Sequence, residues 1–301
     1  MTAIRVLVPA STANLGPGFD CLGLALGLHN TVEMTALDAG FELAIEGEGA
    51  NRLRTDRGNL VMRAADALWD RAGHKPGGLR VKCINGVPLG SGLGSSAAAA
   101  VGGLAAANAL IGSPLSKMEL LKLAHAIEGH PDNAAAALFG GLTIVSAGDD
   151  DVMIDRLDVP PLTVVIALPD VRLSTHDARK ALPRSVPLTH AVFNIGRALL
   201  VARALNTGDY DLLKRAMDDR LHQPYRRKLI PGFDAAEQAA REAGAAAVAL
   251  SGAGPSLAAF APDRHEEIAQ AMKVAFESRG IACRTFVLPA DREGVQIREG
   301  D

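Results

Sequence analysis

The segment that most constrains the fold is the glycine-rich run at 88–98, PLGSGLGSSAA, which continues into an uncharged stretch of alanine and glycine. Glycines at alternate positions let backbone N–H groups come close to an anion. A helix that begins directly after them points the positive end of its dipole at the same place. Ser95 and Ser96 add two hydroxyl groups there. The run therefore predicts a phosphate-binding loop at the start of a buried helix over 95–110.

This loop departs from the two commonest nucleotide-binding motifs. No Lys-Ser or Lys-Thr follows its last glycine, and its glycines do not have the Gly-x-Gly-x-x-Gly spacing. A triphosphate bound here needs its charge balanced by Mg²⁺ or by basic side chains from elsewhere in the chain. The alternative is an ordinary glycine-rich turn with a helix cap, which the combination of alternate glycines and two serines makes the weaker interpretation.

The composition points to a protein that acts on a small molecule. Of the 301 residues, 48% are hydrophobic, enough for a sizeable core, and the net charge of -3 lacks the basic excess of nucleic-acid-binding proteins. The cysteines Cys21, Cys83 and Cys283 are too far apart for a thiolate metal motif. The stretch at 95–112 is too rich in Ala, Gly and Ser to favour membrane insertion. We expect a soluble, cytoplasmic protein with no nucleic-acid or membrane partner.

Hydrophobic periodicity predicts an α+β protein of two lobes rather than a doubly wound sheet. The Gly-, Asp- and Pro-rich segment 147–161 is the best candidate for the boundary, so we expect domains at 1–155 and 156–301, with a loose polar tail from Ala290. The expected strands lie at 4–9, 41–46, 79–84, 142–146, 163–168, 246–251, 257–261 and 282–288. The expected helices lie at 59–72, 95–110, 116–128, 175–182, 188–206, 209–220, 233–243 and 263–278.

Two loops in the first half carry polar side chains suited to a ligand. Residues 9–20, PASTANLGPGFD, leave a strand and present the amide of Asn14 and the carboxylate of Asp20. Residues 128–133, EGHPDN, place two carboxylates and an amide between two helices, which suits a Mg²⁺ ligand and an orienting group. The structural alternatives are a strand-to-loop corner and a helix cap at Asp132.

Three segments of the second half are individually less specific. Residues 173–183, LSTHDARKALP, begin a helix that carries Arg179, and residues 222–226, HQPYR, end on Arg226. A single arginine is most often a solvated side chain. Residues 251–256, SGAGPS, predict a tight turn between two strands, which has the glycines needed to pack against the phosphate loop.

Taken together, these segments resemble the homoserine kinase family of the GHMP kinase superfamily, over nearly the whole chain. The superfamily motif is PLGSGLGSSAA, and the segments typical of the homoserine kinases are PASTANLGPGFD, EGHPDN, LSTHDARKALP and HQPYR, with SGAGPS also in the expected order. The resemblance implies an α+β, two-lobed GHMP kinase fold. Its ribosomal-protein-S5-like N-terminal lobe binds ATP, its C-terminal lobe is ferredoxin-like, and the substrate lies between them. A homodimer is possible.

The implied reaction transfers the γ-phosphoryl group of ATP, with Mg²⁺, to the side-chain hydroxyl of L-homoserine in threonine biosynthesis. By the same resemblance, Arg179 and Arg226 bind the substrate carboxylate, and Asp20 and Asn14 bind its ammonium group. The remaining residues of the implied substrate pocket are His130, Thr175 and Gly254.

The implied catalytic residues are Asn14, Asn133 and Arg179, with the two amides orienting the hydroxyl while Asp132 is structural. No strong base is needed, because phosphoryl transfer through a loose transition state depends mainly on alignment and charge neutralisation. Ser96 and Glu128 are the implied Mg²⁺ ligands. The implied ATP-binding residues are Asn59, near the adenine, with Pro88, Leu89, Gly90, Ser91, Gly92, Leu93, Gly94, Ser95, Ser96, Ala97 and Ala98.

Two alternative functions stay open at this point. Another small-molecule GHMP kinase, of mevalonate or shikimate type, would act on a substrate with a carboxylate but no ammonium group, which leaves Asp20 without a cation to bind. A non-catalytic regulator that binds a nucleotide or an amino acid would have little need for Glu128 and the loop serines as a Mg²⁺ site.

Overall fold

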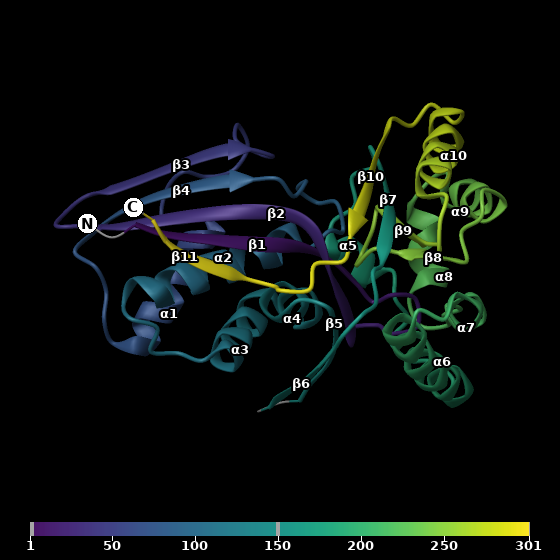
Figure 1. The fold of residues 1–301 in the computed structure, drawn as a ribbon, viewed down its shortest axis with the longest axis horizontal. Coiled ribbons are helices and arrows are strands. Elements are labelled where there is room, and N and C mark those ends of the chain that lie inside the picture. Colours follow the sequence, from purple (N-terminus) through teal and green to yellow (C-terminus); the bar gives the residue numbers. More distant parts are fainter. Residues whose placement is uncertain (1–2, 149–150, 301) are drawn as a thin grey trace.

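Two β-sheets, each with its own helices, organise the chain (Figure 1). The computed structural model describes residues 3–148 and 151–300. The seven-stranded sheet has the order β11–β1–β2–β4–β3, with β5 paired to β2 and β6 paired to β5. β3 and β4 are parallel, and the other pairs are antiparallel. Its strands are β1 (Ala3–Ala13), β2 (Leu22–Leu37), β3 (Phe41–Gly47), β4 (Gly78–Asn85), β5 (Leu142–Ala147), β6 (Val152–Leu157) and β11 (Gln296–Gly300).

Four helices cover one face of this sheet (Figure 1). They are α1 (Leu60–Ala72), α2 (Ser95–Leu110), α3 (Lys117–Glu128) and α4 (Asp132–Phe139). α2 has the predicted bounds and is buried over most of its length. It lies so close to α1 that a Cβ atom at Gly103 would come within 2.3 Å of the Val61 carbonyl oxygen. This close packing explains why its sequence is uncharged and made of small residues.

The predicted ends of the first helices are confirmed. The Asn59 side chain accepts a hydrogen bond from the Val61 N–H and caps α1, which ends at Gly73 in the left-handed conformation. Ser116 and Glu119 form the predicted capping box of α3.

The second sheet has the ferredoxin-like strand order predicted for the C-terminal lobe. Its order β10–β7–β9–β8 is the fourth, first, third and second strand in chain order, and all three pairs are antiparallel. Its strands are β7 (Thr163–Pro169), β8 (Ala247–Leu250), β9 (Leu257–Phe260) and β10 (Cys283–Pro289). The helices of this half are α5 (Thr175–Lys180), α6 (Leu188–Thr207), α7 (Tyr210–Ala216), α8 (Gln223–Arg226), a 3₁₀ turn (Arg227–Leu229), α9 (Phe233–Glu242) and α10 (His265–Glu277).

A shared hydrophobic core joins the two sheets. Val164 and Ile166 of β7 pack in one cluster with Leu24 of β2 and Leu93 of the glycine-rich loop. The intervening Val165 points to the opposite face, into a separate cluster beneath α9 and α10. Because Leu93 is part of the shared core, the glycine-rich loop is anchored where the two halves meet.

Three strands differ from the sequence-based expectation. We predicted no strand where β2 runs, a domain boundary where β6 runs, and a loose tail that in fact contains β11. β11 pairs with β1, with Gly300 opposite Ala3 and Gln296 opposite Leu7. β11 is a terminal strand of mostly polar residues, so it leaves little trace in hydrophobicity, and β6 is a short terminal strand inside the predicted boundary segment. The division at 155 stays a prediction, although the first sheet takes strands from both sides of it.

Across the described ranges, none of the helices is long and apolar enough to span a bilayer.

Candidate active site

A cleft where the two halves meet contains most of the predicted site residues. They come from every segment singled out in the sequence: the loop after β1, the glycine-rich loop, the α3–α4 junction, α5, α8 and the β8–β9 turn. The predicted residues that line it are Asn14, Asp20, Gly90, Ser91, Gly92, Gly94, Ser95, Ser96, Ala97, Glu128, His130, Asn133, Thr175, Arg179, Arg226 and Gly254. Those that do not line it are Asn59, Pro88, Leu89, Leu93 and Ala98, of which Leu93 and Ala98 are core residues.

The glycine-rich loop is held by contacts that only glycine permits. Gly92 and Gly94 have φ of 80° and 68°. A Cβ atom at Gly94 would lie 2.2 Å from Ser11 Oγ, and one at Gly92 would lie 2.3 Å from the Ser251 carbonyl oxygen. The loop ends at the N-terminus of α2, where free N–H groups and the helix dipole favour an anion.

The β8–β9 turn packs against this loop, as the sequence suggested. Ser251 donates from Oγ to the Gly92 carbonyl (2.8 Å), and the Ser256 N–H donates to the Ser91 carbonyl (3.3 Å). Asn14 donates from Nδ2 to the Gly252 carbonyl (2.7 Å), and its Oδ1 accepts from the Asp20 N–H (2.9 Å). Asn14 therefore ties the loop that follows β1 to the C-terminal half.

Ser96 and Glu128 meet at the N-terminus of α2. Ser96 donates from Oγ to Glu128 Oε1 at 2.8 Å. A hydroxyl and a carboxylate beside this glycine-rich loop are a hard-oxygen donor pair that fits Mg²⁺, which usually takes few protein ligands and completes its shell with phosphate and water. In the described part of the chain, no three His, Cys, Asp or Glu side chains cluster as a metal site.

Asp20 and Arg179 form a bidentate ion pair across the cleft. Arg179 donates from Nη1 and Nη2 to the two carboxylate oxygens of Asp20, each at 2.9 Å. Burial lowers the pKa of Arg179, but the bonds to Asp20 outweigh it and raise the pKa. The sequence assigned these residues to opposite ends of one substrate, and the structure pairs them with each other.

Arg226 is the most unusual charge in the cleft. It is 1% exposed, and no carboxylate of the described residues lies within ion-pair distance of it. Its Nε donates to the Ala178 carbonyl (3.3 Å), and Nη1 donates to His222 Nδ1 (3.3 Å) and to the Gly252 carbonyl (3.5 Å). Burial and the nearby Arg179 lower its pKa to about 10. A buried guanidinium without a counter-ion favours binding of an anion.

The start of α4 holds an amide and a carboxylate in fixed positions. Asn133 Oδ1 accepts from Ser11 Oγ at 2.9 Å. Asp132 Oδ1 accepts from the Asn133 N–H and contacts His130 Nδ1, both at 2.9 Å. The bond to Asp132 raises the pKa of His130 against the effect of burial. Pro131 is the N-cap, so the cap role considered for Asp132 is not the one it has.

A second cavity adjoins the first at Ser95 and Ser96. Asn59 lines it, but its side chain is occupied, because Oδ1 caps α1 and Nδ2 donates to the Arg54 carbonyl. Its other lining residues are mainly apolar or amide side chains: Asn30, Ile45, Leu53, Leu60, Val61, Cys83, Asn85, Leu89 and Ala99.

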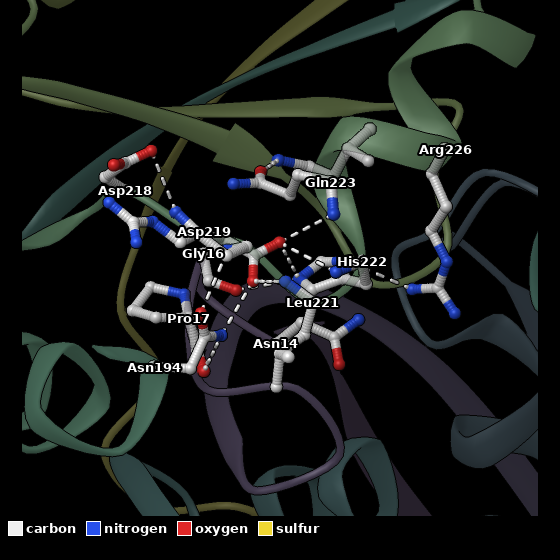
Figure 2. Close-up of polar contacts among 12 residues, drawn as sticks. Asn14, Gly16, Pro17, Asn194, Asp218, Asp219, Leu221, His222, Gln223 and Arg226 are labelled. Atoms are coloured by element: carbon white, nitrogen blue, oxygen red, sulfur yellow. Dashed lines mark hydrogen bonds and ion pairs between the residues drawn. The ribbon is translucent and has the colours of Figure 1, made fainter. Parts of the chain in front are cut away.

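Sequence reasoning missed three side chains that hold residues of the cleft in place, namely Phe19, His222 and Ser11. Phe19 lies under both guanidinium groups, 5.6 Å from Arg179 and 5.0 Å from Arg226, and stacks on His222. Ser11 orients Asn133. All three belong to motifs that the sequence analysis quoted, so their position in those motifs was the available signal. Figure 2 shows the His222 contacts.

Comparison with known proteins agrees with this geometry. The family model described as the GHMP kinases N terminal domain matches residues 59–141, and the GHMP kinases C terminal model matches residues 201–278. A homoserine kinase of Synechococcus sp. (strain CC9605) is 47% identical, covering 97% of this chain and 94% of that protein. One from Moorella thermoacetica is 46% identical, covering 97% and 99%. The crystal structure of homoserine kinase from Cytophaga hutchinsonii superposes with a TM-score of 0.90 at 33% identity, covering 98% and 97%.

Proposed function

We infer that this chain, which belongs to the homoserine kinase family of the GHMP kinase superfamily, phosphorylates the side-chain hydroxyl of L-homoserine with ATP, in threonine biosynthesis. The observation that carries this function is the cleft itself. It places a buried Arg226, which has no carboxylate partner among the described residues, and an Asp20–Arg179 pair opposite a phosphate-binding loop. An amino acid that carries a free hydroxyl supplies both the charges for one end and the nucleophile for the other.

The phosphate end of the site consists of the glycine-rich loop and the start of α2. The N–H groups there would bind the phosphates, and Ser96 and Glu128, which lie 2.8 Å apart, would hold Mg²⁺. When bound, Mg²⁺ would supply the charge neutralisation that a lysine supplies in loops where Lys-Ser or Lys-Thr follows the last glycine. The adjoining apolar cavity receives the adenine, with Asn59 shaping its wall by capping α1.

The substrate end binds a zwitterion. Arg226 and Arg179 bind the carboxylate. Arg226 is buried, and its hydrogen bonds use Nε and Nη1, so the N–H groups of Nη2 remain for the substrate. Asp20 binds the ammonium group, and Asn14 holds the Asp20 backbone in place while its amide stays near the substrate. His130, Thr175 and Gly254 complete the wall. A mevalonate- or shikimate-type substrate has no cation for Asp20.

The reacting hydroxyl lies near Asn133. Ser11 donates to Asn133 Oδ1 and fixes the orientation of the amide, so the amide is already oriented when the substrate hydroxyl binds. Its oxygen bonds to the γ-phosphorus as the bond between that phosphorus and the ADP oxygen breaks, and the hydroxyl proton passes to an oxygen of the transferred phosphoryl group. Asp132 is buried and already accepts hydrogen bonds from its neighbours, so we assign it a structural role. Alignment and charge neutralisation then account for the rate without a strong base.

The test is ADP release with Mg²⁺ and ATP in the presence of L-homoserine, mevalonate, shikimate, L-serine or no acceptor. We expect turnover with L-homoserine, and its loss on addition of EDTA. Turnover with mevalonate or shikimate instead would contradict the assignment of Asp20. Folded protein that binds MgATP and turns over none of the acceptors would favour the regulator function.

A second copy of the chain is the proposed partner, and the cytoplasm is the proposed location. Exposed apolar side chains on one face of α6 support a homodimer: Leu188, Val192, Ile195 and Leu199. Their spacing of four, three and four residues is that of a helix–helix seam. Analytical ultracentrifugation of Leu199→Lys should show more monomer than wild type, and equal sedimentation would exclude this face.

A further inference from the structure

His222 is buried where the loop after β1 meets α8. It has no exposed surface, and Phe19 stacks on it with ring centroids 5.1 Å apart. One ring nitrogen, Nε2, lies 2.7 Å from the Gly16 carbonyl oxygen. The other, Nδ1, lies 3.3 Å from Nη1 of Arg226 (Figure 2). The imidazole therefore bridges the substrate loop and the buried arginine.

The two partners determine the form of the ring. A guanidinium can only donate hydrogen bonds, so Nδ1 must accept and carry no proton. A carbonyl oxygen can only accept, so Nε2 must carry the proton. The ring is then neutral, in agreement with a pKa of His222 that burial lowers. In this form it donates at one end and accepts at the other.

A buried carboxylate, that of Asp219, lies with Oδ2 3.5 Å from Nε2 of this ring and holds the backbone around it. Asp219 Oδ2 accepts from the N–H groups of His222 (3.0 Å) and Gln223 (2.6 Å), and Oδ1 accepts from Asn194 Nδ2 (2.7 Å). Asn194 also donates to the Pro17 carbonyl at 3.1 Å. The loop that carries Asp20 is thus bound to the C-terminal half through two neighbouring carbonyls, those of residues 16 and 17 (Figure 2).

We propose that His222 is a positioning residue for the substrate carboxylate. By accepting from Nη1, it directs the rest of the Arg226 guanidinium into the cleft. By donating to Gly16, it holds the loop with Asp20 at a set distance from that guanidinium. His222 does not line the cleft, so it acts through Arg226 and the loop rather than by contact with substrate or ATP. The proposal rests on the proposed function, since it specifies how the Arg226 guanidinium and the Asp20 carboxylate, which recognise the amino acid, are held at a fixed distance from each other.

Two substitutions separate the two contacts of the ring. Gln places its amide nitrogen near the position of Nε2, so His222→Gln keeps a donor for Gly16 and loses the acceptor for Arg226. Asn places its amide oxygen near the position of Nδ1, so His222→Asn keeps the acceptor and loses the donor. Since hydrogen bonds to charged groups contribute about 1.5–3 kcal/mol, His222→Gln should raise KM for L-homoserine about tenfold or more. KM for ATP should stay near the wild-type value, and His222→Asn should raise the homoserine KM less.

A substrate without the carboxylate makes the test specific. 3-Aminopropan-1-ol is L-homoserine without this group, so His222→Gln and wild type should phosphorylate it with similar kcat/KM. On an Arg226→Ala background, His222→Gln should add little further to the homoserine KM. Equal effects of the Gln and Asn variants, equal KM increases for ATP and homoserine, or an equal loss with the amino alcohol would each overturn the proposal. A wild-type enzyme inactive on L-homoserine would instead refute the proposed function.

Discussion

At the scale of single residues, the charge distribution of the cleft is its most informative property. Arg179 has a carboxylate partner and Arg226 has none among the described residues, although Arg226 is the more buried of the two. Such an arrangement stabilises a complex with an anion rather than the free protein. We therefore expect function at this end of the cleft to depend on Arg226 more than on any stabilising ion pair.

Arg226→Ala should raise KM for L-homoserine by about 10–100-fold, because a charge-assisted hydrogen bond contributes about 1.5–3 kcal/mol. KM for ATP should change much less. Its neighbour Arg227 is the matched control, since it pairs with Asp234 and Glu237 away from the cleft, and Arg227→Ala should leave both constants near wild type. Steady-state kinetics with each substrate varied in turn checks this, and parallel increases in both constants for Arg226→Ala would contradict it.

Asp132→Asn should retain kcat within about tenfold, since removal of a true general base typically costs about 10²–10⁴-fold. The reason is that Asp132 already accepts from the Asn133 N–H and bonds to His130. Thermal unfolding of the variant shows whether it is folded. A folded variant that has lost thousands-fold of kcat would identify Asp132 as the base.

His222 also predicts a pH dependence of stability. Its pKa is lowered by burial, with the charge of Arg226 acting in the same direction and Asp219 and Asp20 opposing it. In the unfolded chain an ordinary histidine takes up a proton as the pH falls through about 6.5, whereas the folded protein resists it. The free energy of unfolding is therefore highest above this pH and decreases as the pH falls below it.

Comparison of wild type with His222→Asn isolates this effect. Between pH 7.5 and 5.5 the Tm of wild type should fall by more than that of the variant, which has no imidazole to protonate. Thermal unfolding at several pH values measures the two slopes. Identical slopes would mean that His222 is protonated equally in the folded and unfolded states.

At the scale of elements, prediction from sequence worked where the pattern is local. α2 has the predicted bounds because its uncharged run of small residues begins directly after the glycine-rich loop, and α3 has them because the Ser116–Glu119 capping box marks its start. β11 was missed because its partner, β1, lies at the other end of the chain and its own residues are polar. β2 was missed because its pairing changes partners along its length, with a register shift opposite Pro9 and Ala10 that breaks simple alternation.

α2 gives a prediction that belongs to this scale. Gly103→Ala should destabilise the protein by about 1–3 kcal/mol, because the new methyl group would overlap the Val61 carbonyl of α1. Gly196 in α6 is the matched control, a helical glycine with open space around it. Gly196→Ala should stabilise by about 0.5–1 kcal/mol, since alanine is the better helix former. Chemical denaturation checks both signs, and destabilisation of equal size at both sites would contradict the packing argument.

At the scale of the whole molecule, the site is a product of the interface between the two halves. The phosphate loop and Asn133 come from the first half, whereas Arg179 and Arg226 come from the second, and the Gly92–Ser251 contact holds them together. No periodicity in the sequence indicates that residues 133 and 226 line one cleft. The family motifs predicted this grouping, while the pairing of Asp20 with Arg179 and the bridge through His222 became visible only in three dimensions.

The most direct test of this arrangement is a crystal structure of the protein with L-homoserine, Mg²⁺ and a non-hydrolysable ATP analogue. We expect the substrate carboxylate on Arg226 and Arg179, its ammonium group at Asp20, and its hydroxyl beside Asn133, with the triphosphate along residues 90–96. An amino acid bound in the reverse orientation, or a carboxylate located away from Arg226, would contradict the central claim that the buried Arg226 guanidinium is the site of substrate recognition.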